Sequence, residues 1–101
     1  MAQFDIYTNN NPDSTVEFLY LLDIQADILS SLETRVVIPL RKNIKAIQHL
    51  NPEFIIGSTS YILLTQELAG VHKSALDEKS SSLKEHRSEI IATLDFMVSG
   101  F

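Results

Sequence analysis

The sequence contains no cysteine, no long apolar run and no basic residue in its first third. Without cysteine the chain forms neither disulfides nor thiolate metal sites, as is usual in a reducing compartment. The longest apolar run near the start, 18–22, is far shorter than the roughly 20 residues of a membrane helix. A secretory signal starts with basic residues, whereas the first one here is Arg35. We therefore expect a soluble, cytoplasmic protein.

The length and composition are those of one small globular unit. The 101 residues are 45% hydrophobic, which excludes a disordered regulator and predicts a single domain over 1–101. A chain of this size buries only about two thirds of the surface that it exposes when unfolded. Dimerisation is a common remedy for the modest stability that results, and we expect an oligomer.

The charge is acidic and unevenly spread. Thirteen acidic and eight basic side chains give a net charge of −5, and six of the acidic ones precede Arg35. An acidic surface repels phosphates, so direct DNA or RNA binding is disfavoured and a basic protein partner fits better. Simple solubility is the alternative explanation. The local basic cluster of Arg41, Lys42 and Lys45 is interpreted as a solvated surface.

Short β-type segments fill most of the chain. Alternating or β-branched residues predict strands over 3–8, 16–25, 34–40, 54–56, 60–65 and 71–76. The strands 54–56 and 60–65 are predicted to form a hairpin, with Gly57 in its turn. Because proline cannot donate to a ladder, Pro39 is expected at a strand end, edge or bulge. The stretch 26–32 is predicted to be a short helical turn or loop, 41–51 is ambiguous, and the polar run 74–82 is interpreted as a boundary.

The C-terminal segment carries the clearest pattern. Ser82 and Glu85 form the Ser-x-x-Glu spacing of a capping box, and apolar residues then follow helical spacing from Leu83 to Val98. Gly100 lies where helices end. A helix of about 16–18 residues, roughly 25 Å long, is predicted. One helix after several short strands indicates a mainly β fold, a barrel or sheet with an appended C-terminal helix.

Motifs of catalysis are missing from the sequence. It has no glycine-rich phosphate loop, no His-x-x-x-His pair and no nucleophile elbow. His49, His72 and His86 lie in separate segments and are interpreted as surface or loop residues. Asp23 and Asp27 fit strand-end and turn chemistry better than a pair of catalytic carboxylates. We therefore expect neither an enzyme nor a metal or other cofactor.

The end of the predicted helix favours binding rather than stability. Asp95 lies near the helix C-terminus, where the macrodipole favours cations. Helical spacing places Ser88, Ala92, Asp95 and Ser99 on one small, mildly acidic stripe, suited to a partner carrying Arg. An ordinary exposed helix face is the alternative. Phe101, beyond a glycine, is expected either to fold back onto the core or to contact a partner.

These segments resemble one toxin family in collinear order and over nearly the whole length. The matching stretches are 3–7, Leu22 to Leu29, Thr34 to Leu40, Ile56-Gly57 with the strand after it, 65–69, and the helix from Leu83 to Phe101. The family is CcdB, the toxins of ccd toxin–antitoxin modules. The resemblance implies the SH3-like barrel shared by CcdB and MazF toxins, with a C-terminal helix and a two-fold homodimer.

The resemblance also implies partners and a site. Family members bind the A subunit of DNA gyrase and trap the enzyme on cleaved DNA, without catalysis by the toxin. A CcdA-like antitoxin neutralises them, and the toxin–antitoxin complex acts as a repressor of its own operon, with DNA contacted only by the antitoxin. The gyrase-binding positions of the family correspond to residues in two segments of this chain: Ile28, Leu29, Asp95, Val98, Ser99, Gly100 and Phe101.

Three of these positions depart from the best-studied family member. That toxin has Trp where this chain has Ser99, Asn at the position of Asp95, and Ile at the end in place of Phe101. Loss of a large aromatic removes a typical binding residue, often worth about 2 kcal/mol or more. Two alternatives therefore stay open: a MazF-like mRNA endoribonuclease, which the acidic charge disfavours, and a degenerate toxin that retains only antitoxin binding.

Overall fold

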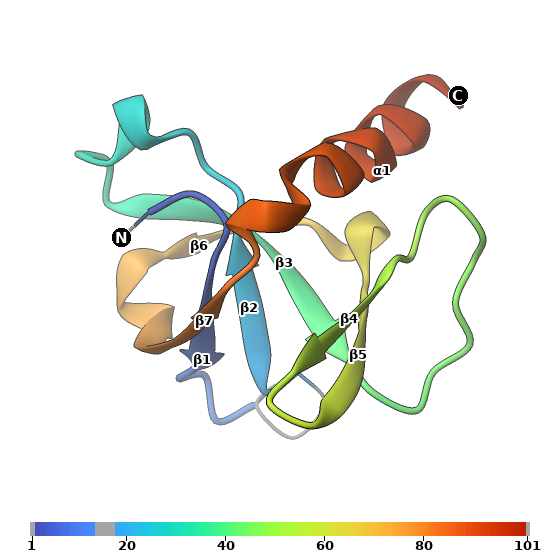
Figure 1. Cartoon of the computed structure of the whole chain (residues 1–101). Helices are drawn as coiled ribbons and strands as arrows, with labels where there is room; N and C mark the ends of the chain where they lie inside the picture. The colour runs from blue at the N-terminus through green and yellow to red at the C-terminus, as the bar shows by residue number, and fades with distance from the viewer. Residues whose placement is uncertain (1, 14–17, 101) are drawn as a thin grey trace.

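The computed structural model describes residues 2–13 and 18–100, and consists of antiparallel strands followed by one α-helix (Figure 1). The strands are β1 (Asp5–Asn9), β2 (Tyr20–Asp23), β3 (Thr34–Arg41), β4 (Glu53–Ile56), β5 (Thr59–Leu63), β6 (Ala69–His72) and β7 (Leu76–Ser82). Short 3-10 turns connect them: η1 (Asp27–Leu29), η2 (Thr65–Glu67), η3 (Lys73–Ala75) and η4 (Lys84–His86). The helix α1 spans Arg87–Ser99.

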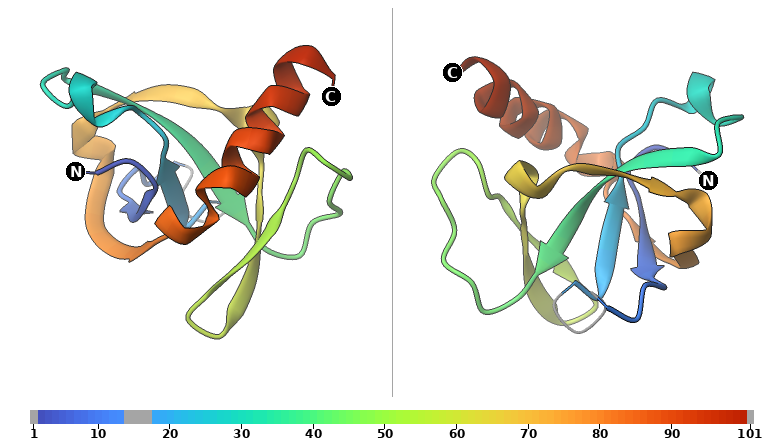
Figure 2. Two further views of the ribbon diagram at one scale, coloured as in Figure 1. Left: turned by 45° about the horizontal axis from the view of Figure 1, so that its top comes forward. Right: turned by 180° about the vertical axis from the view of Figure 1, so that it is seen from behind.

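The sheet is bent into a partly closed barrel, with α1 lying across its open side (Figure 2). The strand order is β4-β5-β3-β2-β1-β7, and β6 also pairs with β3. This arrangement confirms the predicted fold class, a mainly β SH3-like barrel with a C-terminal helix.

Strand β3 is central and changes partners along its length. On one side its residues 37–40 pair with β2. On the other side residues 34–37 pair with β6, and Leu40 and Arg41 pair with β5. The buried Pro39 lies between these two stretches, where a missing N–H interrupts no ladder. The expectation that Pro39 lies at a strand end, edge or bulge is therefore wrong, because a change of neighbour inside the strand accommodates it.

Hydrophobic clusters occupy both faces of the sheet. Adjacent residues alternate between the faces, as strand geometry requires: Ile6, Leu22 and Ile38 belong to the larger cluster, and Tyr7, Leu21 and Val37 to the smaller. Helix α1 closes the larger cluster with Ile90, which is fully buried. Burial on both faces explains why apolar residues stand side by side in β2 and β3, at Leu21 and Leu22 and at Val37 and Ile38.

The hairpin predicted around Gly57 is confirmed. Ile56 pairs with Thr59, which leaves Gly57 and Ser58 as a two-residue turn. The φ angle of Gly57 is +65°, in the left-handed region that glycine adopts without a steric penalty. The ambiguous stretch before this hairpin contains only a single turn, in which the Asn51 N–H donates to the Ile47 carbonyl over 2.9 Å.

Strand β7 was not predicted. The strand expected over 71–76 is replaced by the end of β6 and by η3, and the polar run 74–82 contains β7 rather than a boundary. Strand β7 pairs with β1 at the edge of the sheet, with register shifts along the pair. Only Leu76 of this strand is fully buried. Backbone pairing with β1 holds β7 in the sheet, so its side chains show little of the apolar alternation that predicts a strand.

The helix starts later than predicted and ends where predicted. The hydroxyl of Ser82 accepts a hydrogen bond from the Lys84 N–H at 3.3 Å, but this contact starts η4, and α1 begins only at Arg87. The helix therefore has 13 residues instead of 16–18. At the other end Gly100 is left-handed (φ +80°) and its N–H donates to the Phe96 carbonyl at 2.8 Å, a C-terminal cap.

A buried ion pair joins β2 to β3. The carboxylate of Asp23 accepts hydrogen bonds from Nε and Nη2 of Arg35 at 3.0 and 2.5 Å, and both side chains are almost fully buried. Burial raises the pKa of Asp23, and the hydrogen bonds from Arg35 and from the Gln25 N–H oppose this rise. The Nη1 group of Arg35 has no hydrogen-bond partner among the described residues. The sequence predicted only local turn chemistry for Asp23.

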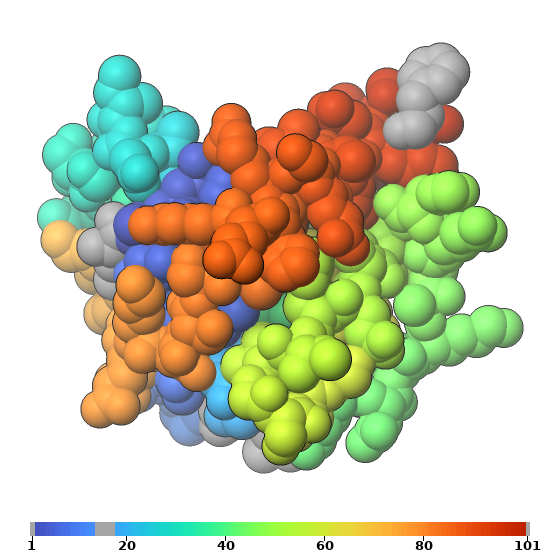
Figure 3. Space-filling view, viewed as in Figure 1, coloured from blue at the N-terminus to red at the C-terminus, as the bar shows by residue number. Residues whose placement is uncertain are grey.

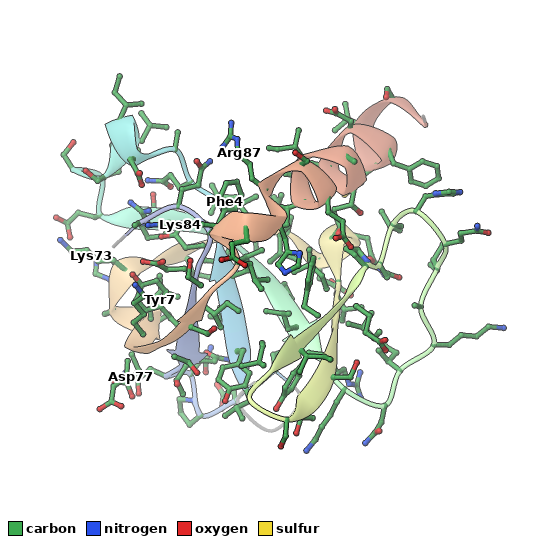
Figure 4. All side chains as sticks on the ribbon, in the orientation of Figure 1. Phe4, Tyr7, Lys73, Asp77, Lys84 and Arg87 are labelled. Carbon is green, nitrogen blue, oxygen red and sulfur yellow. The ribbon has the colours of Figure 1, made fainter. Side chains whose placement is uncertain are left out.

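Removing the negative charge of this pair is expected to destabilise the fold. In Asp23→Asn the buried Arg35 loses its counter-charge, so we expect the free energy of unfolding to fall by about 3 kcal/mol in urea denaturation. The matched control is Asp77→Asn on β7, where the side chain is exposed (Figure 4) and no change is expected. Equal stability of the two variants would contradict the role assigned to the pair.

Candidate partner-binding surface

The last turn of α1 extends beyond the hydrophobic core. Ile90 is fully buried near the start of the helix, whereas the side chain of Val98 is 83% exposed. The sequence placed Val98 on the apolar face, but the sheet beneath the helix does not reach this far (Figure 2). The helix end therefore presents an apolar side chain to solvent. Phe101 lies outside the described residues.

Polar groups at this helix end give it a negative character. The last turn of α1 contains no basic residue, and Asp95 is exposed one turn before the end. The hydroxyl of Ser99 donates to the Asp95 carbonyl at 2.7 Å, so this side chain folds back on its own helix. With the carbonyl end of the helix dipole, Asp95 favours a cationic partner group. The predicted stripe of Ser88, Ala92, Asp95 and Ser99 is exposed throughout.

The turn η1 carries a second exposed apolar group. The side chain of Ile28 is 90% exposed and that of Leu29 is 46% exposed. Two backbone hydrogen bonds shape the turn, from the Leu29 N–H to the Ala26 carbonyl and from the Ser30 N–H to the Asp27 carbonyl. This confirms the predicted helical turn within 26–32. The turn therefore presents Ile28 to solvent, with the half-exposed Leu29 beside it.

These two groups lie at opposite ends of one side of the molecule. The views in Figures 1 and 2 agree in separating η1 from the end of α1, and in Figure 3 both project as separate corners. One protomer therefore does not bring the predicted site residues together. Ile28 and Leu29 form one part of the candidate surface, and Asp95 with Val98, Ser99 and Gly100 forms the other.

The space between the two parts contains residues that were not predicted as site residues. The guanidinium of Arg87 lies 5.5 Å from the centre of the Phe4 ring, and its Nη1 donates to Oε1 of Gln3 at 3.3 Å (Figure 4). The backbone N–H of Gln3 in turn donates to the Asp27 carboxylate at 2.8 Å. Contacts therefore run from the start of α1 to η1. The sequence signal was Arg87, the single interruption of the apolar helix pattern.

A groove lies on another side of α1, against the loop before β4. It encloses about 360 Å³ between Ala92 and Phe96 of the helix and residues 49–52 of the loop. Thr93 fastens the two walls, because its hydroxyl lies within hydrogen-bonding distance of the His49 and Leu50 carbonyls. Of the basic cluster, Lys42 and Lys45 lie exposed on the same loop, as predicted, whereas Arg41 ends β3 and is half-buried.

Side chains that could hold a metal ion or take part in catalysis are not clustered among the described residues at η1, at the end of α1 or at the groove. His49, His72 and His86 are exposed in separate segments, which confirms their interpretation as surface or loop residues. In residues 2–13 and 18–100 no three His, Asp or Glu side chains are placed to hold a metal ion. The same part of the chain contains no helix long and apolar enough to cross a membrane. The exposed groups are suited to contacts with another macromolecule.

The molecule is thus a small SH3-like barrel with a C-terminal helix and two exposed apolar groups, at η1 and at the end of α1. Its sequence matches the family model described as "CcdB protein" over residues 3–100, and the chain belongs to the CcdB family. The match covers nearly all of the 101 residues. Members of this family are gyrase-poisoning toxins of toxin–antitoxin modules.

The contact of Thr93 with the loop generates a stability prediction. Thr93→Val keeps the shape of the side chain but removes a hydroxyl that lies within hydrogen-bonding distance of two backbone carbonyls and of the Thr65 hydroxyl, so the free energy of unfolding is expected to fall by about 1 kcal/mol in urea. Ser99→Ala, which removes an exposed hydroxyl from the same helix, should change it by less than about 0.5 kcal/mol. A larger loss for Ser99→Ala would reverse this assignment.

Proposed function

We propose that this protein is the toxin of a type II toxin–antitoxin module that binds the A subunit of DNA gyrase and traps the gyrase–DNA cleavage complex. Membership of the CcdB family supports the activity. The observation that carries the site assignment is the exposure of Ile28 and Val98, which lie at two positions where the family contacts gyrase. The protein acts by binding, and gyrase itself supplies the cleavage chemistry.

The helix end supplies the first part of the gyrase-binding surface. Val98 offers an exposed apolar side chain, and Gly100 turns the chain away from the helix in a left-handed conformation. The carboxylate of Asp95 faces solvent without a basic residue in the last turn, so it attracts an Arg or Lys of gyrase. Ser99 leaves room for a partner side chain, and Phe101 completes this part of the site.

The turn η1 supplies the second part, through Ile28 and Leu29. Since the two parts lie at opposite ends of one side, a single protomer presents two separate contacts. A two-fold homodimer duplicates both and increases the surface available to gyrase. We propose that the homodimer is the active form.

A CcdA-like antitoxin neutralises the toxin, and the complex represses its own operon. The net charge of −5 opposes direct DNA binding, so the antitoxin makes the DNA contacts. The place of action is the bacterial cytoplasm, where gyrase meets the chromosome.

One observation favours a second function, that of a degenerate toxin which retains only antitoxin binding. The hydroxyl of Ser99 is bound to the helix backbone, and the side chain is too small to fill a pocket on gyrase as an aromatic would. The exposed apolar groups at Val98 and Ile28 favour retained gyrase binding. Poisoning of gyrase by the purified protein separates the two.

The first test is DNA cleavage by purified gyrase with ATP, with and without the folded protein. We expect linear DNA that depends on the protein and becomes visible after denaturation of the complex. A folded protein that binds antitoxin but produces no linear DNA would identify the degenerate toxin. Cleavage of RNA by the protein alone would instead identify an endoribonuclease.

Single substitutions test the site. Because an exposed apolar contact is removed, Ile28→Ser and Val98→Ser are each expected to raise the Kd for the gyrase A subunit roughly tenfold, with little change in stability. Binding is measured by surface plasmon resonance and stability by urea denaturation.

The matched control is Ile55→Ser on β4, a side chain that is 72% exposed, in the hairpin of β4 and β5 that extends away from η1 and from the end of α1 (Figure 1). It should bind gyrase as the unmodified protein does. If Ile55→Ser weakens binding as much as Val98→Ser, the contact surface has been misplaced.

A further inference from the structure

The turn η1 is attached to the fold by hydrogen bonds rather than by burial. None of its three residues, Asp27 to Leu29, is buried, so it has no hydrophobic contact with the core comparable to those of the strands. An exposed turn without buried side chains opens easily unless polar groups hold it. The position of Ile28 therefore depends on the groups that bond to the turn.

One is the Gln3 N–H, which donates to the Asp27 carboxylate at 2.8 Å. Another is the side chain of Gln25, which lies beneath the turn and is 5% exposed. Its Nε2 donates to the Leu29 carbonyl at 2.9 Å, and its Oε1 accepts from the Val36 N–H at 3.1 Å. A single buried amide thus connects the end of the turn to the central strand β3. Both of its hydrogen-bonding functions are used.

Gln25 is itself held by the buried ion pair. Its backbone N–H donates to Oδ1 of Asp23 at 3.0 Å, while Oδ2 of the same carboxylate accepts from Arg35. A continuous set of polar contacts therefore runs from the core to the exposed turn. Because Asp23 and Arg35 are buried and cannot exchange partners with water freely, this support is rigid.

We propose that Gln25, oriented by Asp23 and Arg35, is a positioning residue that keeps the Ile28–Leu29 turn in the conformation that binds gyrase. This inference rests on the function proposed above, and adds to it a residue that does not touch the partner. When only a fraction of molecules has the competent conformation, the apparent Kd rises in inverse proportion to that fraction. If a tenth of the molecules keep the turn in place, the Kd rises about tenfold.

The sharpest variant is Gln25→Glu. When ionised, the introduced carboxylate still accepts from the Val36 N–H but has no donor for the Leu29 carbonyl, so this bond to the turn is lost while the bond from the Gln3 N–H to Asp27 stays. Gln25→Met introduces a side chain of similar length without charge and removes the bonds to Leu29 and Val36. It replaces Gln25→Glu in the experiment if the carboxylate prevents folding.

The chain offers a matched control in Asn51, a second buried amide that bridges a loop to the sheet. Its Oδ1 accepts from the Ile47 N–H at 2.9 Å, and its Nδ2 donates to the Leu63 carbonyl at 3.0 Å and to Oε1 of Gln66 at 2.8 Å. Asn51→Asp keeps the acceptor and loses the donor in a loop that is not part of the proposed site. The variant shows how much the free energy of unfolding falls when a buried amide outside the site is replaced by a carboxylate.

Three quantities are measured on each full-length variant: urea stability, amide hydrogen exchange at Leu29, Ser30 and Leu32, and the Kd for the gyrase A subunit. We expect Gln25→Glu to accelerate exchange at these amides and to raise the Kd about tenfold. Asn51→Asp should lose similar stability, leave these amides protected and change the Kd by less than about twofold.

Faster exchange with an unchanged Kd in Gln25→Glu, while Ile28→Ser still weakens binding, would overturn the positioning role and leave the proposed function intact. An equal rise of the Kd in Asn51→Asp would also overturn it, because the effect would then be one of general stability. If Ile28→Ser binds normally, or the unmodified protein does not bind gyrase, the proposed contact fails and this inference with it.

Discussion

The buried ion pair between Asp23 and Arg35 is the interaction on which the arrangement of the exposed turn depends. It joins the end of β2 to β3, the strand that also pairs with β5 and β6. Removing two charges from water costs several kcal/mol, which only close and well-oriented partners offset. The pair therefore specifies one arrangement of these strands, and through Gln25 it extends that order to η1.

The packed interior of this small fold differs from the end of α1, which lies beyond the core and leaves an apolar side chain exposed. The strands β1, β2 and β3 bury both faces, and α1 covers one of them through Ile90. The same helix then runs past the core and leaves Val98 in solvent. An apolar side chain in such a position adds little to the packing of the protomer and is free to contact another molecule.

Sequence patterns predicted the elements that are formed locally. The hairpin turn at Gly57, the helix end at Gly100 and the helical turn within 26–32 all follow from rules that act over a few residues. Strand β7 was missed because its polar side chains face solvent and only its backbone pairs with β1. Pro39 was misplaced because its surroundings depend on where β6 ends and β5 begins along β3.

By itself, the sequence determined the family, the fold class and the two segments of the candidate site, since these follow from collinear motifs and from local periodicity. Only the tertiary structure decided how distant residues meet. Asp23 pairs with Arg35, Arg87 bonds to Gln3, and η1 lies at the opposite end of one side from the end of α1 (Figure 1). The reason is physical: such contacts join residues from different strands and turns, and their partners are selected by the packing of the whole sheet.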